Sequence, residues 1–277
     1  MCSFPVPAAL VEQARRFYAS GAEPVVPRVA ATVVLLQPPL EVYLLRRAST
    51  MAFASGMYAF PGGSVDPRDS AGGLDWAGPS DVDWAVRLGL PPGAAQAVVC
   101  AAVRELFEES GVLLVAPSAL PTGSGQSSSA PTRWAEQKDA GLEAARQALV
   151  SRELSLADLL RSRGLALNSQ LLEPWARWVT PEFEPRRFDT YFFLAVLPPG
   201  QDARDVSGEA DHTMWVRPAV ALEQVAAREI AMLPPTIVML RDLAGYSDVD
   251  SVLAAAAGRD AASPVMPALE NGRLVVP

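Results

Sequence analysis

Short apolar runs of strand length dominate the hydrophobic pattern of this chain. Residues 28–36 are rich in β-branched side chains, and 41–47 follow after two prolines, so the two segments predict a β-hairpin. Further strands are predicted at 112–117, 173–181, 186–199 and 211–218. Between 94 and 110 the period changes to that of a helix, which a glycine ends. Strands on both sides of this helix indicate a mixed α/β sandwich.

Breaks in the pattern suggest three parts: an N-terminal helix and linker at 1–27, a domain at 28–245 and a C-terminal extension at 246–277. Two insertions are expected in the domain. The first, at about 68–93, is rich in glycine and proline, and we expect a loop that reaches over bound substrate. The second, at about 118–170, joins a Gly/Ser-rich linker to a charged helical stretch, which is either a substrate cap or filler.

Composition narrows the possible partners. The chain has 277 residues, of which 50% are hydrophobic, and a net charge of −8, which argues against a duplex nucleic acid as partner. A small anionic substrate remains compatible with local arginines. Cys2 and Cys100 are too few for a disulfide framework or a thiolate zinc site. With no apolar run long enough for a bilayer and no apolar signal core, we expect a cytoplasmic protein without a membrane partner. A homodimer is compatible with the sequence but not required by it.

The stretch RELFEESGV, residues 104–112, crowds three glutamates onto the predicted helix. Glu108 and Glu109 follow Glu105 by three and four residues, so the three share one face, while Val103 and Leu106 lie on the core side. Three carboxylates that meet at one point repel each other unless a hard cation such as Mg²⁺ or Mn²⁺ binds them. A solvated helix face is the alternative.

Two other segments favour the metal site. The sequence FPGG, residues 60–63, is flexible and could offer the Gly62 carbonyl as a ligand. Downstream, Glu209 lies on a loop that enters a predicted strand and could join the site.

These motifs resemble the Nudix box, G-x5-E-x7-R-E-U-x-E-E-x-G-U with U aliphatic. The second half matches by identity at Arg104, Glu105, Glu108, Glu109 and Gly111, and by class at Leu106 and Val112. The first half, FPGGSVDPRD, has Asp69 where the pattern has its first glutamate. Asp69 precedes Arg104 by 35 residues instead of 8, which gives an insertion of 27 residues. Gln96 occupies the contiguous spacing, so the first glutamate is either replaced by Asp69 or lost.

An interrupted box is similar to that of a Nudix branch of coenzyme A diphosphatases. The segment at 44–63 follows part of the pattern associated with coenzyme A, with Arg47, Gly56 and Phe60 in agreement and Ala52 in place of a second arginine. The resemblance implies a Nudix-type α/β/α sandwich with a mixed central sheet and additional helical insertions. It also implies that water cleaves the diphosphate of a nucleoside diphosphate linked to another moiety, with coenzyme A or an acyl-CoA as one substrate.

The resemblance assigns roles to individual residues. The expected metal ligands for Mg²⁺ or Mn²⁺ are Glu105, Glu109, Glu108 and the Gly62 carbonyl. Arg104 would brace the glutamates, and either Glu105 or Glu209 would be the general base. Substrate would contact Arg47, Gly63, Arg187 and Phe188. Two alternatives stay open: a pyrophosphatase for ADP-ribose or NADH-type dinucleotides, in which Trp175, Trp178 or Phe188 stacks on the base, and a non-catalytic ligand-sensing Nudix domain.

Overall fold

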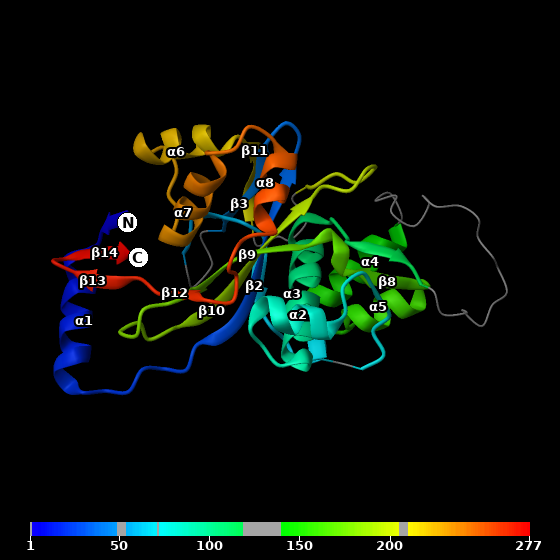
Figure 1. Cartoon of the computed structure of the whole chain (residues 1–277), viewed down its shortest axis with the longest axis horizontal. Helices are drawn as coiled ribbons and strands as arrows, with labels where there is room; N and C mark the ends of the chain where they lie inside the picture. The colour runs from blue at the N-terminus through cyan, green and yellow to red at the C-terminus, as the bar shows by residue number, and fades with distance from the viewer. Residues whose placement is uncertain (1, 49–53, 71, 119–139, 205–209) are drawn as a thin grey trace.

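A mixed β-sheet forms the centre of the computed structural model, which describes residues 2–48, 54–70, 72–118, 140–204 and 210–277 (Figure 1). The strands run in the order β11-β3-β2-β10-β9-β12, with β4 beside β3 and β5 beside β2. Their bounds are β2 Arg28–Gln37, β3 Glu41–Arg47, β4 Tyr58–Ala59, β5 Gly62–Ser64, β9 Glu173–Val179, β10 Phe188–Val196, β11 Ala210–Val216 and β12 Pro264–Val265. The predicted hairpin of β2 and β3 is confirmed, and β10 lies parallel to β2.

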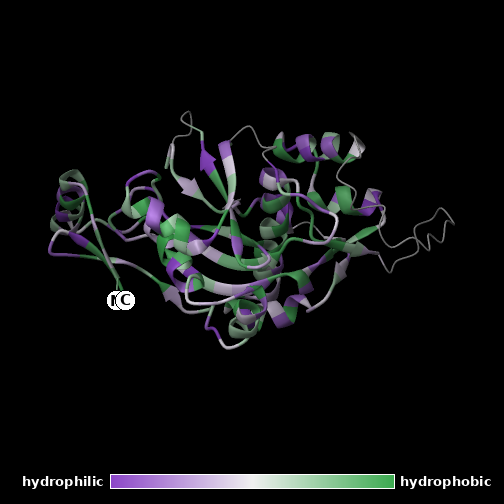
Figure 2. Ribbon diagram, turned by 90° about the horizontal axis from the view of Figure 1, so that it is seen from above, coloured by the Kyte–Doolittle hydropathy of each residue, from purple (hydrophilic) through white to green (hydrophobic). Residues whose placement is uncertain are grey.

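Alternation along the central strands separates two apolar cores. On β2, Val33 and Leu35 face the first core, whereas Val34 and Leu36 face the second. The first core is completed by α3 (Pro92–Ser110) and the second by α6 (Pro218–Ala226), α7 (Pro234–Leu243) and α8 (Val249–Ala256). Apolar positions are concentrated in the central strands and in the helices that pack on them (Figure 2). The predicted α/β/α sandwich is therefore confirmed.

Helix α3 carries the acidic motif, and its ends follow from the sequence. It begins with a proline in its first turn, where a missing backbone N–H costs no hydrogen bond. It ends at Gly111, whose φ of 75° is easy for glycine and whose N–H donates to the carbonyl of Phe107. Val99, Val103 and Leu106 are fully buried. This packing fixes the orientation of the opposite face, which carries the glutamates.

The first insertion is more ordered than its composition predicts. It contains a short 3-10 helix η1 (Pro67–Ser70), strand β6 (Trp76–Ala77) and helix α2 (Asp81–Leu88), which begins with a capping box between Ser80 and Asp83. Trp84 and Leu88 are fully buried in the same core as α3. The prediction of a loop is wrong for residues 81–88, because α2 is amphipathic and packs into the core. The expected reach over the substrate stays a prediction.

The second insertion forms a small layer beside α3. It contributes α4 (Ala140–Val150), α5 (Leu156–Ser162), β8 (Leu165–Asn168) and η3 (Ser169–Leu171), and β7 (Val115–Pro117) comes directly before it. Strands β6, β8 and β7 pair in one sheet, so the two insertions are joined. Arg146 attaches α4 to α3, since it donates to the carbonyl of Glu108 at 2.7 Å. The strand predicted at 112–117 is limited to its last three residues.

The two chain ends form a small sheet at one side of the molecule (Figure 1). It has the order β1-β14-β13, from Cys2–Pro5, Arg273–Val276 and Ala268–Glu270, and α1 (Ala8–Ser20) follows β1. The C-terminal segment also supplies β12 to the central sheet and stacks Arg259 on Trp175 at 3.8 Å.

No single helix of the described residues is long and apolar enough to cross a membrane, although α2 and α3 reach the limit together across a 90° bend.

Candidate active site

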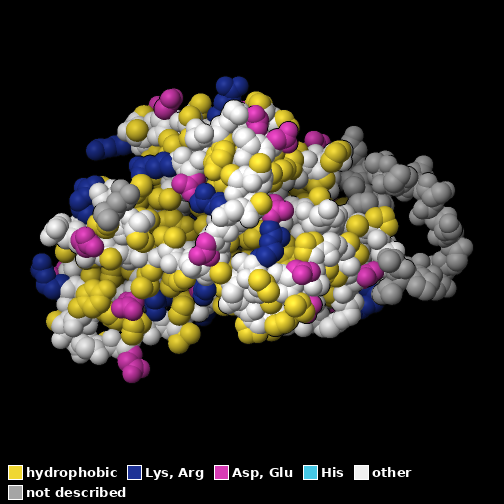
Figure 3. Space-filling view, in the orientation of Figure 1, with side chains coloured by type: hydrophobic (Ala, Val, Ile, Leu, Met, Phe, Trp, Pro, Cys, Tyr) yellow, Lys and Arg dark blue, Asp and Glu magenta, His cyan; other side chains and the backbone are white. Residues whose placement is uncertain are grey.

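A cavity of about 910 Å³ lies where the acidic face of α3 meets β2, β5 and the end of α4. Its walls carry both signs of charge. The acidic residues are Asp66, Glu105, Glu108 and Glu109, and the basic ones are Arg28, Arg47, Arg68, Arg104 and Arg152. Over the face shown in Figure 3, charged side chains of both signs are interspersed with apolar ones. The cavity differs from this surface, because its buried carboxylates lie together in one place.

Two glycines allow β5 to lie close to its neighbours. Gly62 pairs with Thr32 and Gly63 with Ala31 on β2. A Cβ atom on Gly62 would lie 2.5 Å from the Ala31 carbonyl oxygen, and one on Gly63 would lie 2.4 Å from Glu105 Oε1. Any side chain at either position would therefore displace the strand or the glutamate. The Gly62 N–H also donates to Glu109 Oε2 at 2.9 Å, which ties β5 to α3.

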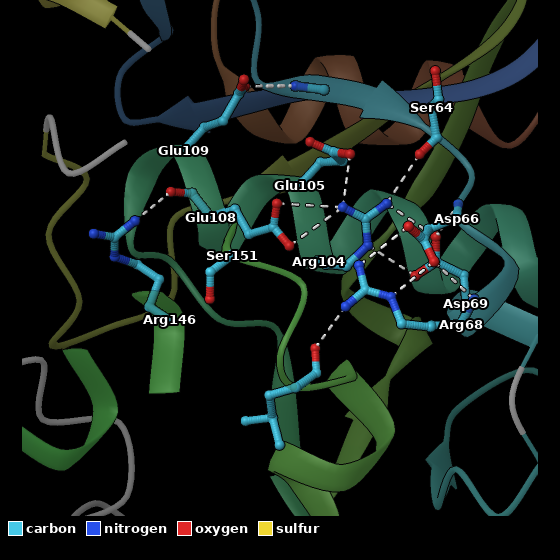
Figure 4. Close-up of polar contacts among 12 residues, drawn as sticks. Ser64, Asp66, Arg68, Asp69, Arg104, Glu105, Glu108, Glu109, Arg146 and Ser151 are labelled. Carbon is cyan, nitrogen blue, oxygen red and sulfur yellow. Dashed lines mark hydrogen bonds and ion pairs between the residues drawn. The ribbon is translucent and has the colours of Figure 1, made fainter. Parts of the chain in front are cut away.

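Arg104 is the centre of the polar network (Figure 4). It is 5% exposed and donates to Asp69, Glu105, Glu108 and the carbonyl of Ser64. Burial favours the neutral guanidinium, but the hydrogen bonds and charges of the carboxylates outweigh it and raise the pKa of Arg104 above its ordinary value. Arg104 is therefore a fixed cation that holds the acidic side chains in this structure.

The structure decides between Asp69 and Gln96 as the contact for this arginine. Asp69 Oδ1 accepts from Arg104 Nε at 2.9 Å, and Oδ2 accepts from Nη2 at 3.0 Å. Gln96 is near the start of α3, two turns before Arg104. Asp69 therefore makes the arginine contact from across the insertion.

A second ion pair lies beside Asp69, whose Oδ2 accepts from the backbone N–H of Asp66 at 2.8 Å. Arg68 bonds to both carboxylate oxygens of Asp66 and donates to the carbonyl of Leu154 at 3.0 Å. The hydrogen bond from Arg68 lowers the pKa of Asp66 to about 2, so this carboxylate stays ionised across the neutral range. The pair joins the η1 segment to the residues that follow α4.

The three glutamates do not converge as the helical spacing predicts. Glu105 and Glu108 both accept from Arg104 Nη1, at 2.7 and 3.3 Å, while Glu109 turns to the Gly62 amide. Within the described ranges, no group of three or more His, Cys, Asp or Glu is arranged to hold a metal ion. The carboxylates therefore do not meet at one point, because Arg104 holds Glu105 and Glu108 while the Gly62 amide holds Glu109. Metal binding by these residues stays a prediction.

The same carboxylates still suit a divalent cation. Burial raises the pKa of Glu105 to about 7, with Arg104 opposing the shift and Glu108 adding to it. Burial also raises the pKa of Glu108. Buried carboxylates that ionise at a cost are stabilised by a nearby cation, and oxygen donors are those that Mg²⁺ and Mn²⁺ prefer. The donor set therefore fits such an ion, provided that Glu105 and Glu108 turn away from Arg104.

Comparison with known proteins decides the family. The model of the NUDT19 Nudix domain matches residues 86–243, which is more than half of the chain. The chain belongs to the Nudix family. The matched region contains the second half of the Nudix box and begins inside the insertion that separates it from Asp69.

Several relatives of this Nudix protein carry a more specific description. An acyl-coenzyme A diphosphatase NUDT19 from Gallus gallus is 30% identical over 248 residues, covering 76% of this chain and 63% of the relative. The protein of the same name from Homo sapiens is 28% identical over 251 residues, covering 78% and 64%. The chain thus spans less than two thirds of the length of these relatives. The crystal structure of a Nudix hydrolase from Alicyclobacillus acidocaldarius has a TM-score of 0.59 and 30% identity, and the match covers 87% of this chain and 99% of that one.

Most of the residues expected to contact substrate line the Nudix cavity. Arg47, Gly63 and Phe188 do so, from β3, β5 and β10. Arg187 does not. It is 7% exposed and donates to the carbonyls of Thr180 and Val25 at 3.0 and 2.8 Å. The prediction for Arg187 is wrong because its side chain is directed away from the cavity that its neighbour Phe188 lines.

Three other residues predicted for the site do not line the cavity or are not described. Trp175 and Trp178 are buried in the second core, and of the three expected stacking residues only Phe188 lines the cavity. Glu209 lies outside the described residues.

Sequence reasoning missed several wall residues, namely Arg28, Thr32, Arg68, Leu149, Val150, Arg152 and Thr190. The position of Arg68 beside Asp69 was a signal for its place near the box. The residues from the end of α4 gave no signal, because only the packing of the insertion brings them to the site.

Proposed function

We propose that this protein is a metal-dependent pyrophosphohydrolase that cleaves the diphosphate of a nucleoside diphosphate linked to another moiety, with coenzyme A or an acyl-CoA as the leading substrate. One observation carries the proposal: in a chain of the Nudix family, the network of Arg104, Glu105, Glu108 and Glu109 faces a wide cavity beside the Gly62–Ser64 strand. The names of the relatives from chicken and human support the choice of an acyl-CoA.

Glu105, Glu108, Glu109 and the carbonyl of Gly62 would hold Mg²⁺ or Mn²⁺. When bound, the ion would supply positive charge for the phosphoryl oxygens on which negative charge develops. The carboxylates would exchange Arg104 for the metal, while Asp69 would keep Arg104 in place beneath them. The glycine strand would let the diphosphate approach the backbone, since neither Gly62 nor Gly63 carries a side chain.

The reaction also needs a base. A water oxygen forms a bond to one phosphorus, the bond from that phosphorus to the bridging oxygen breaks, and the water proton passes to a carboxylate. Glu105 is one candidate, because its carboxylate lines the cavity beside Glu108 and Glu109. Glu209 is the second candidate. Arg47, Gly63 and Phe188 would contact the substrate, since each of them lines the cavity.

Phe188 supports a second candidate substrate. An aromatic ring in the cavity wall suits a purine base, as in ADP-ribose or an NADH-type dinucleotide. The third candidate, a ligand-sensing domain without catalysis, is disfavoured, because a sensor has no need of buried carboxylates that repel each other. A cytoplasmic location and a homodimer stay predictions.

A substrate panel tests the proposal. Coenzyme A, an acyl-CoA, ADP-ribose and NADH are incubated with Mg²⁺, Mn²⁺ or EDTA, and the products are identified by mass spectrometry. We expect cleavage at the diphosphate of coenzyme A, dependent on the metal, and a loss of at least about 100-fold in Glu109→Gln. This variant should fold, because the glutamine oxygen can still accept from Gly62. Glu12→Gln, on the exposed helix α1, is the control. Metal-independent turnover, or full activity in Glu109→Gln, would overturn the proposal.

A further inference from the structure

The turn after α4 forms part of the cavity wall and is anchored on both sides. Leu149, Val150 and Arg152 line the cavity. Before the turn, Arg146 holds α4 to the Glu108 carbonyl at 2.7 Å. After it, the carbonyl of Leu154 accepts from Arg68 at 3.0 Å. Both partners belong to the network around the Nudix box, so the turn has a fixed position beside the carboxylates (Figure 4).

The backbone of the turn is an ordinary helix ending. Arg152 has a φ of 64°, and the amide of Glu153 donates to the carbonyl of Ala148, as in a Schellman motif. Leu149 is fully buried and anchors the turn in the first core. The geometry thus presents the side chain of Arg152 at the cavity wall without any need for that side chain to support the fold.

Charge shows what Arg152 can bind. The cavity holds four carboxylates, whereas the substrate proposed above is itself anionic. Arg104 and Arg68 cannot offset this repulsion freely, since carboxylates already hold both guanidinium groups. Arg152 is exposed, and no side-chain partner for it is found among the residues that the structure describes. A guanidinium in this setting matches a phosphate group in charge and in hydrogen-bond geometry.

We propose that Arg152, which the second insertion contributes, is a substrate-binding residue that contacts a phosphate group of the substrate. This inference rests on the proposed function and extends it to the insertion. The phosphate has two sources, the scissile diphosphate and a further phosphate elsewhere on the substrate, such as the one on the ribose of coenzyme A. The second insertion would then be a part of the binding site, and not filler.

The chain supplies a close control. Arg228 is also exposed, has a φ of 61° and follows a helix whose end is closed by a bond from Glu229 to Gln224. It does not line the cavity. Arg152→Gly and Arg228→Gly therefore remove the same side chain from the same kind of backbone. Glycine tolerates a positive φ, so neither variant should lose stability.

The experiment measures kcat and KM for coenzyme A and for dephospho-coenzyme A, which lacks the ribose phosphate. We expect Arg152→Gly to raise KM for coenzyme A about tenfold, in line with the loss of a charge-assisted hydrogen bond. Arg152→Lys should retain part of the affinity, and Arg228→Gly should match the wild type. An equal rise for both substrates identifies the diphosphate as the partner, and a rise for coenzyme A alone identifies the ribose phosphate. Unchanged KM for both substrates in Arg152→Gly would overturn the inference.

A binding assay separates this inference from the proposed function. If the wild type hydrolyses neither substrate, the proposed function fails, and calorimetry with inorganic pyrophosphate and with coenzyme A then tests Arg152 alone. Weaker binding of either ligand by Arg152→Gly, but not by Arg228→Gly, supports the contact. Equal binding of both ligands by wild type and Arg152→Gly, including no binding by either, overturns it.

Discussion

Asp69 and Arg104 are 35 positions apart in the sequence and form a buried ion pair with two hydrogen bonds, of 2.9 and 3.0 Å. Their side chains are 1% and 6% exposed. Helix α2 and the first part of α3 lie between the two residues in the sequence. The ion pair therefore brings the two halves of the interrupted Nudix box together in space. The insertion leaves this contact intact because its own helix packs into the core beside α3.

Asp69→Asn tests how much this ion pair contributes to stability. The substitution removes the charge that faces a buried guanidinium, so we expect the free energy of unfolding to fall by about 2–3 kcal/mol. Urea denaturation measures the change. Gln96→Ala, at the contiguous position of the Nudix pattern, should change stability by less than about 0.5 kcal/mol. If the two variants were equally stable, Asp69 would not be the residue that holds Arg104.

Gly63→Ala tests the close approach of β5 and α3. The new Cβ would lie 2.4 Å from Glu105 Oε1, so the glutamate must turn away from its position. Because small displacements of catalytic groups are costly, we expect kcat to fall on the order of 100-fold. The fold should survive, since a flexible side chain absorbs the clash.

Gly72→Ala is the matched control, because a Cβ there has nothing within 4 Å. Circular dichroism and a substrate assay should show a folded and active protein. Equal activity of the two glycine variants would contradict the proposed role of Glu105.

The stability of the metal-free protein should depend on Glu105. Burial raises its pKa from 4.5 to about 7, so the folded state keeps a proton that the unfolded chain releases in this window. The free energy of unfolding should therefore fall as pH rises from 4.5 to 7, by on the order of 2 kcal/mol. In Glu105→Gln this decline should be smaller, and what remains comes from Glu108, whose pKa burial also raises.

Thermal denaturation in EDTA at pH 5 and pH 8 measures the effect. Asp66, whose pKa is lowered to about 2, loses its contribution only in more acidic solution, below the unfolded value of 3.8. Mg²⁺ should stabilise the wild type more at pH 8 than at pH 5, because the ion favours ionised carboxylates. A pH profile that is the same in wild type and Glu105→Gln would exclude Glu105 as the titrating group.

Arg146→Met tests how the second insertion is held. Arg146 is 1% exposed and donates to Glu143 and to the Glu108 carbonyl, so its loss removes the buried hydrogen bond that joins α4 to α3. We expect a loss of about 2–3 kcal/mol in urea denaturation. Glu143→Gln keeps the bond to the Glu108 carbonyl and should cost less. A cost as large for Glu143→Gln would show that the bond to α3 contributes little.

Local patterns in the sequence determined the elements and the acidic face. The spacing of Glu105, Glu108 and Glu109 places them on one face of α3 wherever that helix packs, because neighbours at three and four positions are set by helix geometry. The strands β2 and β10 follow equally from their apolar runs. The Nudix resemblance rests on the same local motif, which is why it could be stated before the fold was known.

Tertiary structure alone decided which distant groups meet. Whether Asp69 or Gln96 reaches Arg104 depends on the path of the insertion. The glycine and proline content of the insertion predicts a loop, so the burial of Trp84 in the core could not be predicted from it. The separation of Arg187 from Phe188 depends on which side of the strand faces the cavity. Arg152 reaches the site only because Arg146 and Arg68 hold the ends of its turn. Contacts of this kind join segments far apart along the chain, so no local periodic pattern of residues predicts them.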